Sequence, residues 1–269
     1  MARLGFLLGC CLFALGCGGS GDERAADSLK GELRNSRLGY SLRYPSEWRG
    51  AKGEQANDVR ALQGPGGREC VVAPVLGLPD WSSEEGRRGY YEDLARERKL
   101  DLRSSGPVKA ASGEGYTAVT VAKRRLVRSA TVASGGVGVS VVCSAPEDAF
   151  EKADEDVFRP IVSTVKVRRD ERAEKIQSRV ASLDGVTAAG IVVSKDRAQA
   201  QLRLASREAG LPAVKDTLRL LVEGLDAGRV GVQAFKDPVN PVIGNWDART
   251  NRAFVQAIPN PPERYALED

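Results

Sequence analysis

The chain has 269 residues, no histidine, five cysteines and a formal net charge of +4 at pH 7. The absence of histidine excludes Ser-His-Asp and Cys-His catalysis, His-ligated metal sites and an imidazole that titrates near neutral pH. With 42% hydrophobic and 28% charged residues, the composition is that of a globular protein rather than a disordered or membrane-embedded one.

The first residues have the pattern of a secretory signal peptide. Arg3 supplies a positive charge, an apolar run extends from Leu4 to Gly16, and Cys17 is followed by small residues. The run is shorter than the roughly 20 residues that span a bilayer. Residues 1–16 are therefore predicted to be a signal peptide that is removed on export.

The end of this segment, Ala14–Cys17, resembles the lipobox of bacterial lipoproteins. The resemblance implies that the Cys17 sulfur carries diacylglycerol, and that acyl chains such as palmitate hold the protein at the outer face of the cell membrane without crossing it. Leu7–Cys10 matches the lipobox slightly better by residue type but leaves too short an apolar region for a signal. The other interpretations are an ordinary cleaved signal or a buried start of the fold, with Cys17 incidental.

The remaining cysteines follow from this assignment. Cys10 and Cys11 leave with the signal and Cys17 carries lipid, so Cys70 and Cys143 remain. Two thiols in an oxidising compartment suggest one disulfide. The alternative is a pair of unbonded buried thiols, which behave as small hydrophobic groups.

The chain after the signal begins with a segment of low apolar content. Residues 17–36 are rich in glycine, serine and charge, which predicts a flexible, lipid-anchored tether. The alternation of Tyr40–Tyr44 predicts a strand that Pro45 ends. Gly64–Gly67 is predicted to be a turn between two short strands, and residues 82–99 a helix.

The second half of this first domain reads as strands and a helix. Strands are predicted over 114–123, 125–133 and 136–144, followed by a helix that begins with Ser144–Glu147. The apolar alternation of Ile161–Val167 predicts a closing strand.

Two of these segments carry a resemblance to a known family. Gly39–Trp48 looks like the start of PsbP-like domains, which in bacteria include actinobacterial lipoproteins of the Lpq type, and Phe158–Val167 resembles the last helix-to-strand segment of these domains. The resemblance covers about residues 36–168. It implies an α+β fold with an antiparallel sheet sandwiched by helices. Members of the family are mostly assembly or interaction factors without a shared active site, so no catalytic residues are implied.

The first domain is thus predicted over 37–168, and a smaller domain over 169–237. The order of elements in the second domain is α-β-β-α-β, with strands at 186–194, 198–206 and 229–235. It loosely resembles the BON-type and ring-building modules of envelope proteins. Several prolines interrupt residues 238–269, for which a loose Pro-rich hairpin over 242–257 around Trp246 and an extended tail over 258–269 are predicted. Trp246 is interpreted as a domain-packing residue rather than a docking anchor.

Candidate catalytic and metal-binding groups are weak. Ser163 and Lys166 have the S-x-x-K spacing of penicillin-binding proteins, but the segment alternates like a strand and no S-D-N or K-T-G follows. Six carboxylates crowd residues 147–156, and they are interpreted as a solvated helix face rather than a cation site. No catalytic residue, metal ligand or cofactor is predicted.

The strongest basic run consists of Lys123, Arg124, Arg125 and Arg128. It is a candidate contact with anionic lipid headgroups. A solvated hairpin turn is the favoured alternative, and export argues against nucleic acid as a partner.

Together these patterns predict a non-enzymatic lipoprotein of the cell envelope that binds or helps assemble other envelope components, with an envelope protein as partner. One alternative is a lipoprotein that binds a small hydrophobic or lipidic ligand between sheet and helices. The other is a carboxylate-dependent envelope hydrolase.

Overall fold

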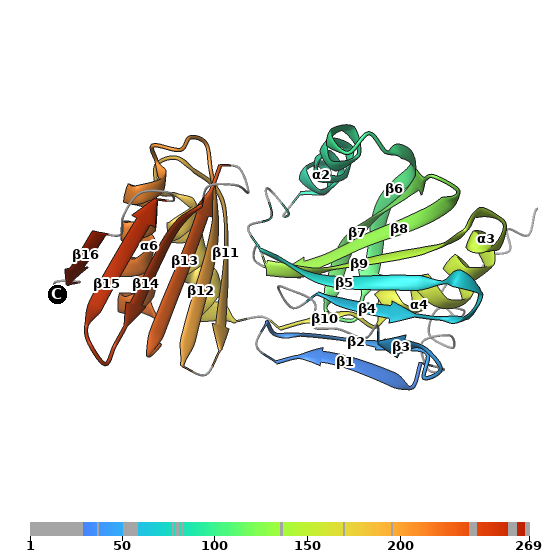
Figure 1. The fold of residues 1–269 in the computed structure, drawn as a ribbon, viewed down its shortest axis with the longest axis horizontal. Coiled ribbons are helices and arrows are strands. Elements are labelled where there is room, and N and C mark those ends of the chain that lie inside the picture. The colour runs from blue at the N-terminus through green and yellow to red at the C-terminus, as the bar shows by residue number, and fades with distance from the viewer. Residues whose placement is uncertain are drawn as a thin grey trace, which may run out of the picture.

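The computed structural model describes residues 29–36, 38–50, 59–76, 78, 81, 83–134, 137–168, 170–194, 196–236, 241–257 and 263–266. They form two domains, each with its own hydrophobic core (Figure 1). The class is mixed α+β with several antiparallel sheets, as the sequence predicts.

The N-terminal domain is built on a seven-stranded antiparallel sheet with the order β3-β4-β5-β9-β8-β7-β6. Its strands are β3 (Arg49–Gly50), β4 (Arg60–Gln63), β5 (Glu69–Leu76), β6 (Asp101–Ala110), β7 (Gly113–Ala122), β8 (Arg125–Ser134) and β9 (Val137–Pro146). The predicted turn at Gly64–Gly67 is present, with a short 3-10 turn over Pro65–Gly67. The edge strand β6 was not predicted, because it lacks the apolar alternation of its neighbours.

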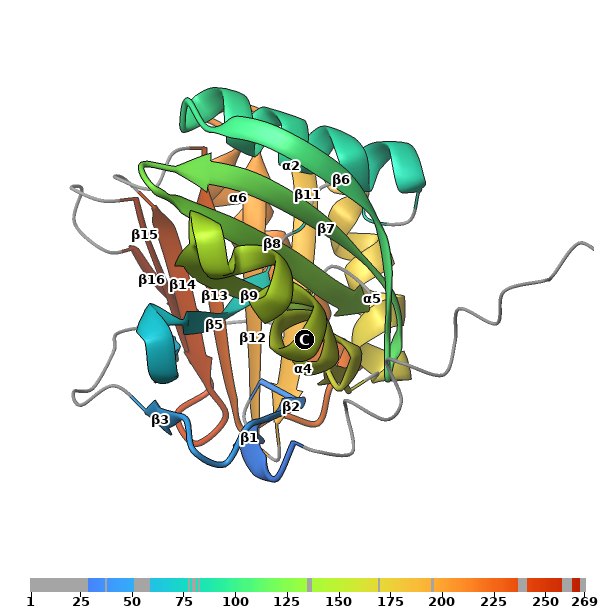
Figure 2. The ribbon, with the colours of Figure 1, turned by 90° about the vertical axis from the view of Figure 1, so that its right-hand side faces the viewer.

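Helices pack on both faces of this sheet (Figure 2). The helix α2 (Glu84–Glu97) begins where Ser83 Oγ accepts a hydrogen bond from the Gly86 amide at 2.9 Å, and it lies against β6 and β7. On the other face lies a helical segment of α3 (Phe150–Ala153), a π-helical turn (Asp154–Phe158) and α4 (Arg159–Ser163). Phe150 and Phe158 of this segment are at most 4% exposed.

The predicted closing strand at 161–167 is wrong for most of its length. Residues 161–163 belong to α4, and only β10 (Lys166–Val167) is extended. Pro160 occupies the first turn of the helix, where its missing N–H costs nothing. Ile161 and Val162 are at most 1% exposed, so burial against the sheet outweighs the strand preference of their branched side chains.

A separate three-stranded sheet with the order β1-β2-β10 lies along this domain. The strand β1 (Gly31–Asn35) pairs with β2 (Tyr40–Tyr44), and Leu33 lies opposite Leu42. The predicted tether over 17–36 is therefore wrong at its end, because residues 31–35 form a strand that pairs with β2. Residues 17–28 lie outside the described residues.

The C-terminal domain has one six-stranded sheet with the order β11-β12-β13-β14-β15-β16. Its elements are α5 (Glu171–Ala181), β11 (Val186–Ser194), β12 (Arg197–Leu204), α6 (Gly210–Gly224), β13 (Arg229–Phe235), β14 (Val242–Asp247), β15 (Arg252–Ala257) and β16 (Glu263–Ala266). The predicted α-β-β-α-β order is present, with α6 connecting the parallel pair β12 and β13.

The second domain was predicted to end at residue 237, but its sheet continues beyond this residue. β14 pairs with β13, β15 with β14 and β16 with β15, so 242–257 is an integral hairpin and 263–266 adds an edge strand. The prolines that predicted an irregular segment fall in the connections before and after this hairpin.

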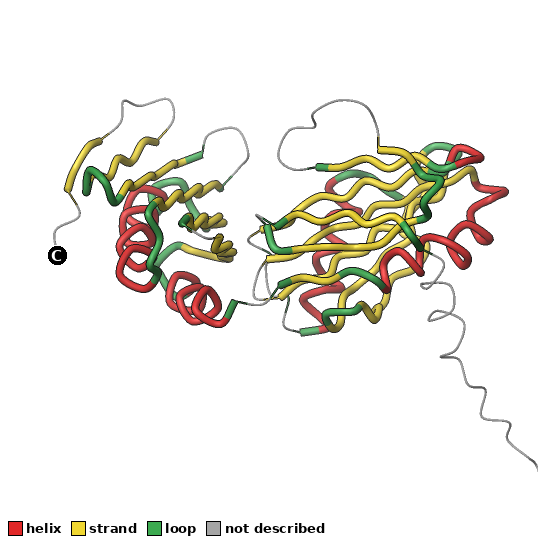
Figure 3. Tube along the Cα trace, turned by 90° about the horizontal axis from the view of Figure 1, so that it is seen from below, coloured by secondary structure: helices red, strands yellow, loops and turns green. Residues whose placement is uncertain are grey.

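Both helices of the C-terminal domain lie on one side of its sheet, and no described helix covers the other side (Figure 3). The close approach of α6 depends on Gly244, because a Cβ there would lie 2.5 Å from Val214 Cγ1. The open side faces away from the core. The two domains meet at β11, where Val192 is buried with the N-terminal core and the Arg168 guanidinium donates to the Val193 carbonyl.

Candidate binding site

The predicted cysteine pair is bonded. Cys70 on β5 lies directly opposite Cys143 on β9, and a disulfide joins the two sulfurs. Both side chains are fully buried. The predicted disulfide is therefore confirmed, whereas the predicted lipidation site, Cys17, lies outside the described residues.

The basic run is divided by the sheet rather than gathered on one surface. Lys123 and Arg124 occupy the turn between β7 and β8 and are exposed. Arg125 donates to the Gly67 carbonyl at 2.7 Å and to Ser144 Oγ at 2.8 Å. Arg128 points to the opposite face of the sheet and is only 8% exposed. A headgroup contact that includes Arg128 is therefore excluded, and only Lys123 and Arg124 remain available for it.

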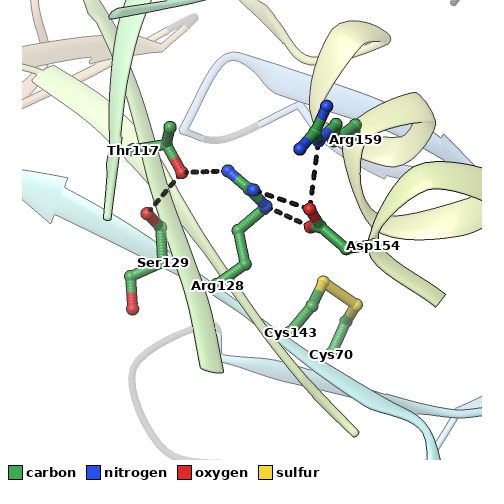
Figure 4. Close-up of polar contacts among 7 residues, drawn as sticks. All are labelled: Cys70, Thr117, Arg128, Ser129, Cys143, Asp154 and Arg159. Carbon is green, nitrogen blue, oxygen red and sulfur yellow. Dashed lines mark hydrogen bonds and ion pairs between the residues drawn. A yellow bond between two sulfur atoms is a disulfide. The ribbon is translucent and has the colours of Figure 1, made fainter. Parts of the chain in front are cut away.

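Arg128 lies in a buried polar cluster under the helical segment (Figure 4). Its Nη2 donates to Asp154 Oδ2 at 2.7 Å, its Nε donates to Asp154 Oδ1, and its Nη1 donates to Thr117 Oγ1 at 2.9 Å. Arg159 Nε donates to the same Asp154 Oδ2 at 3.0 Å. The bidentate geometry and the extra hydrogen bonds offset the cost of burying the charges.

This cluster corrects the interpretation of the acidic segment 147–156. Asp154 is 4% exposed and is held by two guanidinium groups, so it is not part of a solvated helix face. Both oxygens of Asp154 accept hydrogen bonds from arginine side chains. Because Asp154 is the first residue of the π-helical turn, its pairing with Arg128 links this turn to β8. The cluster is thus a structural connection between helix and sheet rather than a place for a ligand.

The other sequence candidates are also structural. Ser163 ends α4 and its Oγ donates to the Pro160 carbonyl at 2.8 Å, while Lys166 lies in β10 and is exposed. Trp246 packs against the core of the C-terminal domain, and its Nε1 donates to Asn251 Oδ1 at 3.2 Å. This position supports its interpretation as a packing residue.

A hollow with a volume of about 790 Å³ lies on the open side of the six-stranded sheet. Alternation along the strands creates it, because Ala198, Val230 and Ala253 point into the core while their neighbours point outward. The lining comes from β12–β15 and from the turn after β14. It consists of Arg197, Ala198, Gln199, Arg229, Val230, Gly231, Asn245, Trp246, Asp247, Thr250, Arg252, Ala253 and Phe254.

One row across the hollow is strongly charged. The strand register places Arg197 beside Arg229, Arg229 beside Asp247, and Asp247 beside Arg252. Arg229 Nε lies 3.4 Å from Asp247 Oδ2, and both side chains are more than a third exposed. Because adjacent strands lie about 4.8 Å apart, the row spaces its charged groups at steps of this size.

The next row is polar and uncharged. It runs from Gln199 through Gly231 and Asn245 to Phe254. Gly231 leaves the middle of the row open, because a Cβ added there would meet only Asn245 Oδ1, at 3.4 Å. Phe254 is half-buried at the end of the row. The hollow thus combines cationic groups, amides and one aromatic ring.

Sequence reasoning did not find this site. Each of the three arginines is the first residue of its strand, which is a readable signal: Arg197, Arg229 and Arg252 all precede an alternating run. Which strands are neighbours, however, depends on the parallel pairing of β12 with β13 and on the inclusion of β14 and β15 in the sheet.

The described residues contain no group of three or more His, Cys, Asp or Glu side chains that could hold a metal ion. None of the described helices has the length and apolar character needed to cross a membrane.

Comparison with known proteins gives structural neighbours only. No family model matches the chain, and no curated protein is a significant match. Among solved structures, the chain is similar to the cyanobacterial PsbP (CyanoP) of Synechocystis, with 14% identity and a TM-score of 0.39. This match covers 56% of this chain and 97% of that one.

Two further solved structures are similar to the chain. The Ran-binding protein Mog1p of Saccharomyces cerevisiae has 13% identity and a TM-score of 0.37, covering 51% of this chain and 94% of that chain. A protein from Bacteroides thetaiotaomicron has 10% identity and a TM-score of 0.32, covering 88% of each chain. PsbP, whose domain the N-terminal segment resembles, is therefore among the structural neighbours.

Proposed function

We propose that this protein is a non-enzymatic binding protein of the cell envelope, and that the open side of its C-terminal sheet is the binding surface. The observation that carries the proposal is the hollow of about 790 Å³ on a sheet face that no described helix covers. Asp247 is the one carboxylate among the described lining residues, and it forms an ion pair with Arg229.

In this proposal the N-terminal domain is a PsbP-like sandwich that supports the binding domain. The motif at Gly39–Trp48 and the helices on both faces of the seven-stranded sheet support this assignment. The interior between that sheet and α4 is filled by side chains such as Phe158 and Ile161, which are fully buried. This packing does not favour a hydrophobic ligand there.

The proposal also places the protein at the outer face of the cell membrane, with lipid on Cys17. The lipobox-like Ala14–Cys17 supports this. Lys123 and Arg124, which are exposed, would add a contact with anionic headgroups worth about 1 kcal/mol per charge. Palmitate labelling tests the anchor: label is expected on the wild-type protein and absent from Cys17→Ala, and equal labelling of both would contradict it.

The binding surface is tested by placing a photo-crosslinking amino acid at Asn245, in the hollow, and in a separate variant at Glu223, which is exposed on α6. Irradiation of intact cells of the native host is expected to give a discrete adduct from position 245 and none from position 223. The same adducts from both positions, or none from position 245, would contradict the proposed surface.

A further inference from the structure

The charged row of the hollow fits an anionic partner. Three guanidinium groups and one carboxylate lie side by side on four neighbouring strands. The row therefore carries a net positive charge. Arginine presents a planar fork of donors that matches a carboxylate with two parallel hydrogen bonds. The row already pairs one arginine with a carboxylate, because Arg229 Nε lies 3.4 Å from Asp247 Oδ2.

The neighbouring row fits hydroxyl groups. The amides of Gln199 and Asn245 each offer both donors and acceptors, which is what a hydroxyl group needs, since it also donates and accepts. Phe254 offers an apolar surface at the end of the row. The hollow thus combines groups that bind carboxylates, amides and an aromatic surface. This combination complements sugar units that carry carboxylates.

The geometry is less suited to other anionic partners. A peptide that binds by strand addition needs the free backbone of an edge strand, but β12–β15 are paired on both sides. A lipid surface would cover exposed, projecting residues, whereas these groups line a recess. The opening lies across four strands, so at about 4.8 Å per strand it accommodates an extended chain with repeated charges.

We infer that the hollow binds an anionic glycan whose sugar units bear carboxylates, with the arginine row binding the carboxylates and the amide row the hydroxyls. This inference rests on the proposed binding function and names the ligand class for the same surface.

Calorimetric titration of the full-length mature protein tests the inference. The probes are an oligogalacturonate, neutral dextran, poly-L-glutamate and a polyglycerol phosphate. The oligogalacturonate is expected to bind saturably, and added salt is expected to weaken its binding. Dextran is expected not to bind. Binding of poly-L-glutamate or of polyglycerol phosphate as tight as that of the oligogalacturonate would overturn the assignment to a carboxylate glycan.

Three variants locate the binding. Arg252→Gln removes one fork from the row and is expected to weaken the oligogalacturonate affinity about tenfold, the effect of losing a charged hydrogen bond. Gly231→Val fills the hollow and is expected to weaken binding at least as much. The matched control is Arg219→Gln, which removes the same charge from the exposed side of α6 and is expected to leave affinity within about twofold.

Unchanged binding in both hollow variants, or no binding of the oligogalacturonate to the wild type, would overturn the inference. If an adduct still forms at position 245 in cells, the proposed binding surface stands and only the ligand class is wrong. Thermal unfolding of each variant is measured alongside, and Gly231→Val is expected to fold because its added Cβ meets only the Asn245 side chain.

Discussion

Arg125 and Arg128 lie three residues apart on β8, and this odd spacing sends their side chains to opposite faces of the sheet. Arg125 stays at the surface, while Arg128 enters the core and finds Asp154. The sequence alone could have shown that the basic run is not one surface patch. Side chains alternate between the two faces of a strand, so residues three apart do not share a face. The sequence could not have shown the partner of Arg128, since Asp154 comes from a distant helical turn.

The buried pair gives the first prediction. Asp154→Asn keeps the shape of the side chain but leaves the Arg128 charge buried without its carboxylate, so it is expected to lower the free energy of unfolding by about 3–5 kcal/mol. Urea unfolding followed by tryptophan fluorescence measures it. The control is Glu155→Gln on the exposed side of the same turn, expected to change stability by less than about 0.5 kcal/mol. Equal losses in the two variants would show that the pair has no special role.

At the scale of elements, local pattern predicted most strands and the two-helix framework of the C-terminal domain. The strand β13 has the predicted bounds 229–235, because Val230, Val232 and Ala234 recur at every second position there. The pattern failed at α4, where the branched residues of 161–163 mimic a strand. It predicted the hairpin of β14 and β15 but not the pairing of β14 with β13 or the edge strand β16, because prolines lie in the connections before and after the hairpin. In both places the deciding interaction is between segments rather than within one.

The packing of α2 on the sheet gives a second, pH-dependent prediction. Tyr91 of α2 stacks on Tyr116 of β7 at 5.9 Å, and its hydroxyl lies 2.9 Å from Thr131 Oγ1. Burial raises the pKa of the Tyr91 phenol above its ordinary value of 10.0. Above about pH 10 the unfolded chain therefore loses this proton while the folded chain keeps it, and stability falls as pH rises.

The slope contributed by Tyr91 approaches about 1.4 kcal/mol per pH unit once its phenol is ionised in the unfolded chain. Tyr91→Phe is expected to flatten the fall of stability between pH 9 and about pH 11, while Tyr90, whose pKa burial also raises, keeps its own contribution. Urea unfolding at several pH values compares the two proteins. If the free energy of unfolding falls equally with pH in the two proteins, this account is contradicted.

At the scale of the whole molecule, the main cores of the two domains lie in different clusters of the described residues, and the disulfide belongs to the N-terminal one. Cys70 and Cys143 are 73 residues apart, and closing a loop of that size in the unfolded chain is worth about 4 kcal/mol in the chain-entropy model. The double variant Cys70→Ala/Cys143→Ala is therefore expected to lower the N-terminal domain's melting transition and leave the C-terminal domain's transition in place. Scanning calorimetry separates the two.

The C-terminal transition is the internal control for this experiment. A joint shift of both transitions would mean that the contact at Val192 and Arg168 couples the domains into one unfolding unit. Free thiols counted under denaturing conditions complete the test: two reactive thiols in the untreated mature protein would show that the disulfide does not form.

The position of β2 between β1 and β10 affects how the chain folds during its synthesis. Arg43 and Thr164, which are hydrogen-bonded, lie 121 residues apart, so the sheet closes only when almost the whole N-terminal domain is present. Pairing over such a separation is slow, because loop closure must precede it. In a chain that is synthesised from its N-terminus, Tyr40 and Leu42 therefore stay exposed until residue 167 has been made.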